Sequence, residues 1–407
     1  MSAQPSKHPG TGRPLRVGMF SPYSLSVPGG VQAQVMGLAS ELRHLGVEVR
    51  VLAPCDGPPP ATFVTPLGSS LPTNGNGSVA PLAPDPSCQL RTIRALSEEA
   101  FDVLHLHEPF VPGATHTALF VGESPIIATF HAAGDSLAYK YLRLPVHAAG
   151  QRIAHRVAVS ESARELVYRY TGGEYEILFN GVELDGYRNA AAAPTTAPTI
   201  FFLGRHEERK GLDVLLAAVA TIPDDLVVWI AGEGPDTARL RAQYAGDQRL
   251  QWLGRLSEAD KIERMKGATV FCAPSLHGES FGVVLIEAMA AGTAIVASGL
   301  EGYRTVATDG VDARLVGPGD VGALAGALRE VLGDSSLRAA LVAAGARRAE
   351  AFSMRTLAER YIEIYREVLA SARPVPPPQR PPWTRMMMSA FGRRDTVARS
   401  FTERRGS

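Results

Sequence analysis

The sequence lacks several features that would assign it to familiar classes of protein. Its 407 residues include three cysteines, Cys55, Cys88 and Cys272, whose spacing fits no metal-binding motif. No apolar run reaches about 18 residues, the length that a membrane-spanning helix needs, and residues 1–14 contain no apolar stretch typical of a secretion signal. The formal net charge is +0, so no overall positive field attracts nucleic acid. We therefore expect reduced thiols, a cytoplasmic location and no nucleic-acid partner.

What the sequence contains is an alternation of short apolar runs with helical patterns, which is typical of βαβ units and parallel sheets. The length suggests two or three domains, and a hydrophobic content of 45% is sufficient for sizeable cores. We predict an α/β protein with two Rossmann-like domains that face each other across a central cleft. The expected strands are 15–21, 47–53, 103–107, 126–131, 156–160 and 175–179 in the first half, and 199–205, 226–231, 250–253, 270–273 and 294–297 in the second.

Composition also marks the boundaries between the parts of the chain. A linker rich in Ala, Pro and Thr at 189–198 separates the two halves. The stretch 54–87 is long and rich in Gly, Pro and Ser, so we expect it to be irregular, either as a functional loop or as a disordered one. The predicted parts are a disordered N-terminus at 1–14, a first domain at 15–190, a second domain at 199–353, a last helix at 354–370 and a Pro- and Arg-rich tail at 371–407.

The tail carries eight arginines against two acidic residues, Asp395 and Glu403. It is interpreted in two ways. A solvated, disordered segment would have this polar composition. A segment that docks on an anionic membrane leaflet would also have it, with the arginines binding headgroups and apolar residues such as Trp383 and Phe391 inserting.

The most informative segment is 277–292, which holds two glutamates eight positions apart. Glu279 lies in a turn rich in Gly and Ser, whereas Glu287 lies inside an otherwise apolar helix. A buried carboxylate is costly unless it is paired, and no Lys or Arg occurs between Leu276 and Tyr303. Either Glu287 pairs with a distant residue or it binds polar groups of a ligand such as a sugar. The turn also opens a helix N-terminus, where backbone N–H groups favour a phosphate.

A second cluster follows the predicted strand 199–205. Arg205 and Lys210 would lie at the carboxyl end of this strand, where α/β sheets bind their ligands. Two cations there could hold a diphosphate leaving group as its negative charge develops. The alternative is a solvated charged loop, because Glu207, Glu208 and Arg209 are neighbours.

Histidines end two of the predicted strands in the first half. His131 is either a core residue with satisfied hydrogen bonds or a site residue. His105 and His107 point to the same face of their strand, which could suggest a metal. No third ligand is apparent, and Glu108 would point the other way, so we predict no metal site.

Two glycine motifs complete the set. Gly29–Gly30 follows the first strand and precedes a helix, so the backbone there could approach a ligand phosphate or sugar closely, or it could simply turn. The run 232–237 partly mimics a dinucleotide fingerprint. Its third glycine is missing and no acidic residue ends the next strand, so an NAD site is rejected.

Together these motifs carry a family resemblance. Gly204–Arg205, Lys210–Gly211, the turn 232–235 and the pair Glu279 and Glu287 resemble the retaining GT-B glycosyltransferases of family 4. In the first half, the segments 21–32, 76–80, 103–109 and 128–131 are similar to those of actinobacterial phosphatidylinositol mannosyltransferases. The resemblance covers roughly residues 15–368.

The resemblance implies an enzyme that moves mannose from GDP-mannose to the inositol ring of phosphatidylinositol, peripherally bound to the inner face of the cell membrane. It implies no obligatory cofactor, and the chain has no Asp-x-Asp motif for a metal, although use of Mg²⁺ stays open. It also implies that helix 354–370 crosses back to the first domain. The catalytic residues carried over are His131, Glu279, Arg205 and Lys210; the donor-binding residues are Gly30, Arg205, Lys210, Leu256, Lys261, Glu279, Ser280, Phe281, Gly282 and Glu287; and the acceptor-binding residues are Tyr23, Gln32 and Asn76.

The acceptor half departs from the family pattern. Pro81 and the segment 132–136 stand where the family carries basic residues, and the helix before strand 103–107 has few cations, mainly Arg91 and Arg94. Two alternatives therefore stay open. One is the same donor chemistry with another nucleotide sugar, such as a UDP-sugar, and a different lipid or soluble acceptor. The other is an inactive GT-B scaffold that acts by binding.

Overall fold

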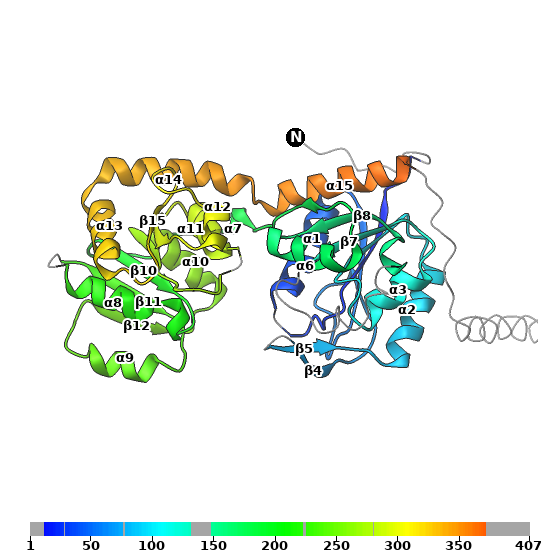
Figure 1. Ribbon diagram of the computed structural model, residues 1–407, viewed down its shortest axis with the longest axis horizontal. Helices are drawn as coiled ribbons and strands as arrows, with labels where there is room; N and C mark the ends of the chain where they lie inside the picture. Colours follow the sequence, from blue (N-terminus) through cyan, green and yellow to red (C-terminus); the bar gives the residue numbers. More distant parts are fainter. Residues whose placement is uncertain are drawn as a thin grey trace, which may run out of the picture. The chain divides into compact units, whose positions relative to one another are not determined.

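The computed structural model describes residues 12–27, 29–75, 78–131, 148–222, 225–279 and 281–371 (Figure 1). The chain divides into two compact units. The first unit combines the residues up to Ile177 with those from Tyr361 onward, and the second unit is Leu178–Arg360. Each unit is built around its own parallel sheet, which confirms the predicted α/β class of two Rossmann-like domains.

The first unit contains a seven-stranded sheet in which every pair of neighbouring strands is parallel. The central strands are buried along their whole length, as expected for a parallel sheet covered on both faces. Helices α1 (Gly30–His44), α2 (Pro86–Glu98), α3 (Ala114–Val121) and α6 (Glu161–Thr171) belong to this unit. In sheet order the strands are β3 (Val64–Pro66), β2 (Glu48–Ala53), β1 (Arg16–Phe20), β6 (Val103–His107), β7 (Ile126–Phe130), β8 (Ile153–Ala158) and β9 (Glu176–Ile177).

The second unit contains a six-stranded parallel sheet. Alternate residues of its strands enter two apolar clusters: Phe201 and Phe271 lie in one, and Ile200 and Val270 in the other. In sheet order the strands are β12 (Leu250–Gly254), β11 (Val227–Ala231), β10 (Thr199–Leu203), β13 (Val270–Ala273), β14 (Ala294–Ser298) and β15 (Arg314–Val316). The helices are α7 (Leu184–Asn189), α8 (Leu212–Ala220), α9 (Thr237–Gln243), α10 (Glu258–Gly267), α11 (Val283–Ala291), α12 (Glu301–Val306), α13 (Val321–Gly333) and α14 (Ser335–Glu350).

The strand order fixes where each unit can hold a ligand. In the first sheet the direction of progression reverses between β1 and β6, and in the second it reverses between β10 and β13. Open α/β sheets bind ligands beyond the carboxyl ends of the strands at such a reversal. We therefore expect a ligand site in the loops that follow these four strands.

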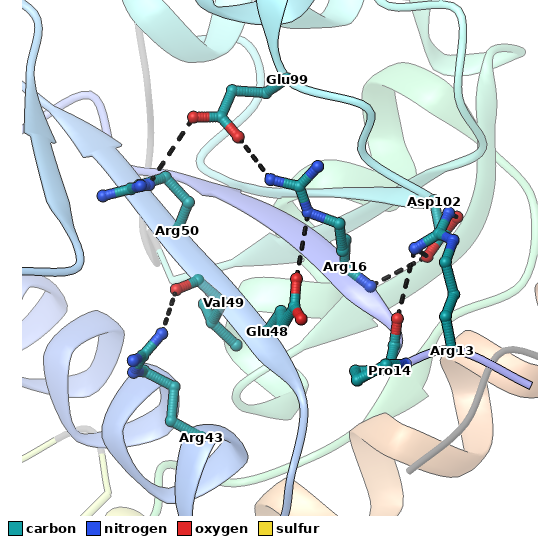
Figure 2. A network of polar contacts seen from close by, with 9 residues as sticks. All are labelled: Arg13, Pro14, Arg16, Arg43, Glu48, Val49, Arg50, Glu99 and Asp102. Atoms are coloured by element: carbon teal, nitrogen blue, oxygen red, sulfur yellow. Dashed lines mark hydrogen bonds and ion pairs between the residues drawn. The ribbon is translucent and has the colours of Figure 1, made fainter. Parts of the chain in front are cut away.

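At the opposite side of the first sheet, ion pairs link the amino-terminal ends of the strands, as Figure 2 shows. Arg16, the first residue of β1, pairs with Glu99 at 2.7 Å and with Glu48 at 3.2 Å. Arg13 pairs with Asp102. These ion pairs join the starts of β1 and β2 to the loop before β6. They therefore stabilise the amino-terminal ends of the strands and not the carboxyl ends, where a ligand would bind.

The stretch 54–87 is not irregular, so that expectation was wrong. It contains β3 and an antiparallel hairpin of β4 (Leu71–Gly75) and β5 (Ser78–Leu82). An isolated bridge between Tyr23 and Leu82 joins the hairpin to the loop after β1. The strands are short and rich in Pro and Gly, which hides their alternation. Strand β8 also begins at Ile153, ahead of the predicted 156.

The segment 178–190 was assigned to the first domain, but its side chains pack in the second unit. Val182, Leu184 and Tyr187 are buried in the same apolar cluster as Phe201. The backbone of Val182 also pairs with Ser353. The change of unit therefore precedes the Ala- and Pro-rich linker, because burial and not composition decides where a domain ends.

Helix α15 (Met354–Ala370), the last helix in the described part of the chain, has the predicted bounds. It begins in the second unit, and its residues from Tyr361 onward belong to the first. Among the described helices, none combines the length and the apolar character that crossing a bilayer requires. The predicted tail lies beyond residue 371, outside the described residues.

Candidate active site

Among the described residues predicted for the site in the first unit, Tyr23, Gly30 and Gln32 follow β1 and His131 follows β7. His131 directly follows β7, and its backbone N–H donates a hydrogen bond to Oε1 of Glu108. Its Nε2 lies 2.9 Å from Nδ1 of His107, the last residue of β6. Burial lowers the pKa of His131 to about 4, so this imidazole is neutral at physiological pH.

Glu108 is a further candidate site residue, which was not among the residues predicted for the site. It is the one non-glycine residue with positive φ in the described part of the chain, at 51°. Such a backbone costs about 1–3 kcal/mol and is found most often at functional sites. The conformation brings the carboxylate to the backbone of His131. The only signal in the sequence was the position of Glu108 directly after a buried strand.

The loop between β1 and α1 is held by its own side chains. Nε2 of Gln32 donates to the carbonyl oxygens of Val27 at 3.2 Å and Ser24 at 3.4 Å. Burial, with a smaller contribution from the nearby Glu108 carboxylate, raises the pKa of Tyr23, so its hydroxyl stays protonated. Tyr23 and Glu108 therefore belong to one neighbourhood, whereas Asn76 lies outside the described residues.

Helix α1 starts at Gly30 without a side-chain cap. Its N-cap is Gly29, and no acidic residue lies in its first turn. By contrast, α2 and α6 begin with Asp85 and Ser160, whose side chains accept hydrogen bonds from the first backbone N–H groups. The uncapped N–H groups of α1 leave room for an anionic ligand beside the reversal point.

His105 and His107 do not form a metal pair. Nδ1 of His105 bonds to the hydroxyl of Tyr365 and Nε2 to the hydroxyl of Thr129, both at 2.8 Å. Within the described ranges, no group of three or more His, Cys, Asp and Glu side chains could hold a metal ion.

In the second unit, Lys210 in the loop after β10 contacts Glu279 in the loop after β13. Nζ of Lys210 is 2.5 Å from Oε1 of Glu279, and the Ser275 hydroxyl donates to the same oxygen at 3.2 Å. Ser275 in turn lies 3.1 Å from the buried hydroxyl of Tyr303. The carboxylate of Glu279 is therefore held by Lys210, a predicted site residue, and by Ser275, which the sequence did not point to.

A glycine lets the chain present Lys210 in this way. Gly211 has φ +67°, and a Cβ atom there would come within 2.0 Å of the Pro274 carbonyl oxygen. No other residue fits this close approach without moving the backbone.

Arg205 is placed differently from Lys210. Its side chain is 68% exposed, and its nearest acidic partner is Glu207 at 3.5 Å. The arginine that reaches Glu279 is Arg209, at 3.5 Å, which also pairs with Glu207 at 2.7 Å. The structure thus brings Lys210 and Arg209 to the carboxylate, and Arg205 stays on the surface of the same loop.

Glu287 has a distant partner, which was one of the two alternatives. Nζ of Lys261 on α10 lies 3.0 Å from its Oε1. Burial alone would lower the pKa of Lys261, but the carboxylates of Glu287 and Glu258 outweigh it and raise that pKa. The Lys261 ammonium also lies 5.5 Å from the ring centre of Tyr187. Leu256, in the loop before α10, packs against the apolar cluster of this unit.

The turn before α11 combines a core residue with a free helix N-terminus. Phe281 is buried and stacks on Phe179, with ring centres 5.0 Å apart, so its backbone and not its ring is available to a ligand. Gly282 is the N-cap at φ +93°, with no side-chain cap and no acidic residue in the first turn. Ser280 lies outside the described residues.

Comparisons with known proteins agree with this arrangement. The family model described as Glycosyl transferases group 1 matches residues 185–348, and the one described as Glycosyltransferase Family 4 matches residues 28–185. Two solved structures are similar in fold. A glycosyltransferase from Rickettsia africae has a TM-score of 0.66 and 18% identity, over 88% of this chain and 100% of that one. A sucrose-phosphate synthase from Thermosynechococcus elongatus has a TM-score of 0.63 and 20% identity, over the same shares.

Curated relatives are more similar in sequence. A phosphatidyl-myo-inositol mannosyltransferase from Mycobacterium leprae is 41% identical over 88% of this chain and 98% of its own length. The protein of that name from Propionibacterium freudenreichii is 36% identical over 74% of this chain and 81% of its length. A D-inositol 3-phosphate glycosyltransferase from Mycolicibacterium smegmatis is 28% identical over 88% and 93%. Because the alignment with the first of these relatives runs through both units, the chain belongs to the phosphatidyl-myo-inositol mannosyltransferase family of glycosyltransferases.

Proposed function

We propose that this chain transfers a mannosyl residue from GDP-mannose to the inositol ring of phosphatidylinositol at the inner face of the cell membrane. The observation that carries the proposal is the Lys210–Glu279 pair at the reversal point between β10 and β13, beside the uncapped start of α11. A nucleotide sugar combines a diphosphate with two sugar rings. The cation and the free helix N-terminus suit the diphosphate, and the carboxylates suit the hydroxyls of the sugar rings.

In the second unit each group then has a role toward the donor. Lys210, Arg205 and the N–H groups of α11 stabilise the diphosphate as its negative charge develops. Glu279 holds hydroxyls of the mannose, and Glu287 holds those of the ribose. Both carboxylates act by positioning the donor and not by moving protons.

Transfer with retention of configuration needs no protein nucleophile in this scheme. The bond between the anomeric carbon and the phosphate oxygen breaks, and the inositol oxygen bonds to the same face of that carbon. The proton of the inositol hydroxyl passes to the departing phosphate oxygen. Charge on the leaving group is met by Lys210 and the helix N-terminus, so the proposal includes no obligatory metal.

The first unit supplies the neutral hydrogen-bonding groups of the reaction. His131 positions the hexose and the acceptor hydroxyl. Tyr23 and Gln32 bind the inositol headgroup, and the free N–H groups at Gly30 approach the diphosphate. The acceptor remains in the membrane, so the enzyme works from the bilayer surface, where anionic lipids and the Arg-rich tail attract each other.

The test is transfer of radiolabel from GDP-mannose to liposomes that contain phosphatidylinositol. UDP-sugars serve as parallel donors, and liposomes of phosphatidylglycerol serve as an acceptor control of equal charge. Label in the lipid phase with GDP-mannose and phosphatidylinositol alone is the expected result. Label from a UDP-sugar would overturn the donor assignment. Absence of turnover with every donor would favour a binding scaffold.

One observation favours a second candidate, an uncharged soluble acceptor such as free inositol. The two arginines of α2 are already engaged: Arg91 donates to the Leu67 carbonyl at 3.2 Å, and Arg94 pairs with Glu98 at 2.7 Å. Few cations are then left there for an anionic lipid headgroup. Label in a water-soluble product when free inositol replaces the liposomes would support this candidate.

A further inference from the structure

Three imidazole rings are stacked in a row at the carboxyl ends of β6 and β7. The ring centres of His105 and His107 are 4.5 Å apart, and those of His107 and His131 are 5.2 Å apart. The row runs from the buried centre of the first unit to the start of the loop after β7. His107, in the middle, touches both neighbours.

The inner ring of the row is fully engaged. His105 bonds through one nitrogen to Tyr365 and through the other to Thr129. Thr129 lies 2.7 Å from the hydroxyl of Tyr361. With both nitrogens occupied, His105 contributes only ring stacking to His107.

His107 therefore has one polar partner within the described residues. Its Nδ1 lies 2.9 Å from Nε2 of His131, and its buried Nε2 has no hydrogen-bond partner there. A neutral imidazole carries its proton on one nitrogen. Buried N–H groups without an acceptor are rarer in proteins than buried acceptors without a donor. The proton of His107 consequently belongs on Nδ1, from which it is donated to His131.

This direction determines the state of the outer ring. Nε2 of His131 accepts the hydrogen bond, so it carries no proton of its own. The neutral ring must then carry its proton on Nδ1. Burial lowers the pKa of His107 and His131, so neither ring gains a second proton near neutral pH.

We propose that His107 is a positioning residue that holds His131 in the Nδ1–H tautomer, so that His131 donates a hydrogen bond to a substrate oxygen and does not accept the proton of the acceptor hydroxyl. The part that concerns the substrate rests on the proposed function. It agrees with a reaction in which the departing phosphate takes that proton. The tautomer itself rests on the hydrogen bonds and the burial of the three rings and not on the proposed function.

Two variants of His107 separate the hydrogen bond from the packing. His107→Phe keeps an aromatic ring in the stack but removes the donor, and it also removes the unpartnered Nε2. His107→Asn keeps an N–H donor near the position of Nδ1. We expect His107→Phe to lower kcat roughly 10- to 100-fold, with the KM for the donor sugar within about twofold of wild type. His107→Asn should retain most of kcat, and the Tm of His107→Phe should not fall.

The decisive measurement is the imidazole ¹⁵N spectrum of the full chain labelled at histidine, with the His131 signals assigned from their absence in His131→Gln. Wild type should show a pyrrole-type Nδ1 and a pyridine-type Nε2 for His131. His107→Phe should shift both toward an average of the two tautomers, and His107→Asn should leave them near wild type. A protonated Nε2 in wild type, or unchanged shifts and kcat in His107→Phe, would overturn the proposal.

The spectrum is independent of the substrate. If the chain proves inactive toward phosphatidylinositol while the ¹⁵N shifts are as expected, the proposed function fails and the tautomer assignment stands. If transfer is observed and the shifts are reversed, the assignment fails alone.

Discussion

The two units prepare their candidate site residues in opposite ways. In the second unit the carboxylates are held by cations: Lys210 contacts Glu279, and Lys261 contacts Glu287. In the first unit, neutral imidazoles are held by hydrogen bonds and stacking, as for His107 and His131. Ion pairs suit the charged part of a nucleotide sugar, because its phosphates can join an existing network of charges. Neutral imidazole rings suit hydroxyl groups, because an uncharged hydroxyl is positioned by oriented hydrogen bonds and not by ion pairs.

The strongest way to break this comparison is Glu279→Gln. The amide keeps the shape of the side chain but removes the charge that Lys210 contacts. We expect transfer to fall about 10²- to 10³-fold or more, with the circular dichroism spectrum unchanged. The matched control is Glu330→Gln, which removes a carboxylate from a surface pair with Arg314. Near-normal turnover of the Glu279 variant would contradict the site assignment.

The two lysines of the second unit should differ in effect. In the proposed function Lys210 acts on the leaving group, so we expect Lys210→Met to lower kcat about 10²-fold. Lys261→Met removes the partner of Glu287. Because Glu287 holds the ribose in the proposed function, we expect the donor KM to rise about tenfold with kcat little changed. Steady-state kinetics against GDP-mannose separates the two. Equal effects on kcat would refute the distinction.

Acid should destabilise the first unit through its histidines. Burial lowers the pKa of His105 to about 3 and that of His131 to about 4, from an ordinary 6.5. The unfolded chain therefore binds protons that the folded unit excludes, and the free energy of unfolding falls as pH drops from about 6.5 to about 4. Each ring should contribute roughly 2 kcal/mol of this loss at pH 5.

Urea unfolding at pH 7.5 and pH 5.0 tests this expectation. His105→Gln should reduce the difference in midpoint between the two pH values. His44→Gln, whose wild-type side chain is 74% exposed, should leave the difference unchanged. A midpoint that is independent of pH in wild type would show that the rings are accessible to protons in the folded state.

The smallest effect on activity is expected for Phe281→Leu. The aromatic ring packs on Phe179 and Phe352 in the core, so its loss should cost about 1 kcal/mol of stability. The donor KM should stay within about twofold of wild type, since only the backbone of Phe281 is available to a ligand. A large rise in KM at unchanged Tm would place the ring in the donor site instead.

The fold could be predicted well where strands are apolar along their length, as at 270–273 and 294–297. The hairpin β4–β5 was missed because its short strands lack a clear apolar alternation. The acidic pair Glu279 and Glu287 could be identified because a carboxylate in an apolar helix is costly. Lys210 and Lys261 were also among the predicted site residues, but their pairing with these carboxylates could not be predicted. Ser275 and Arg209 were not predicted, since loops that only folding brings near give them their positions.

The placement of α15 has a consequence for the order in which the chain takes shape during synthesis. Tyr361 and Tyr365 complete the hydrogen bonds of Thr129 and His105, although more than 200 residues separate them along the chain. The second unit is continuous, from Leu178 to Arg360, so it can close while the ribosome is still translating. The first unit begins earlier but is completed later, since Thr129 and His105 reach these partners only after α15 has left the ribosome.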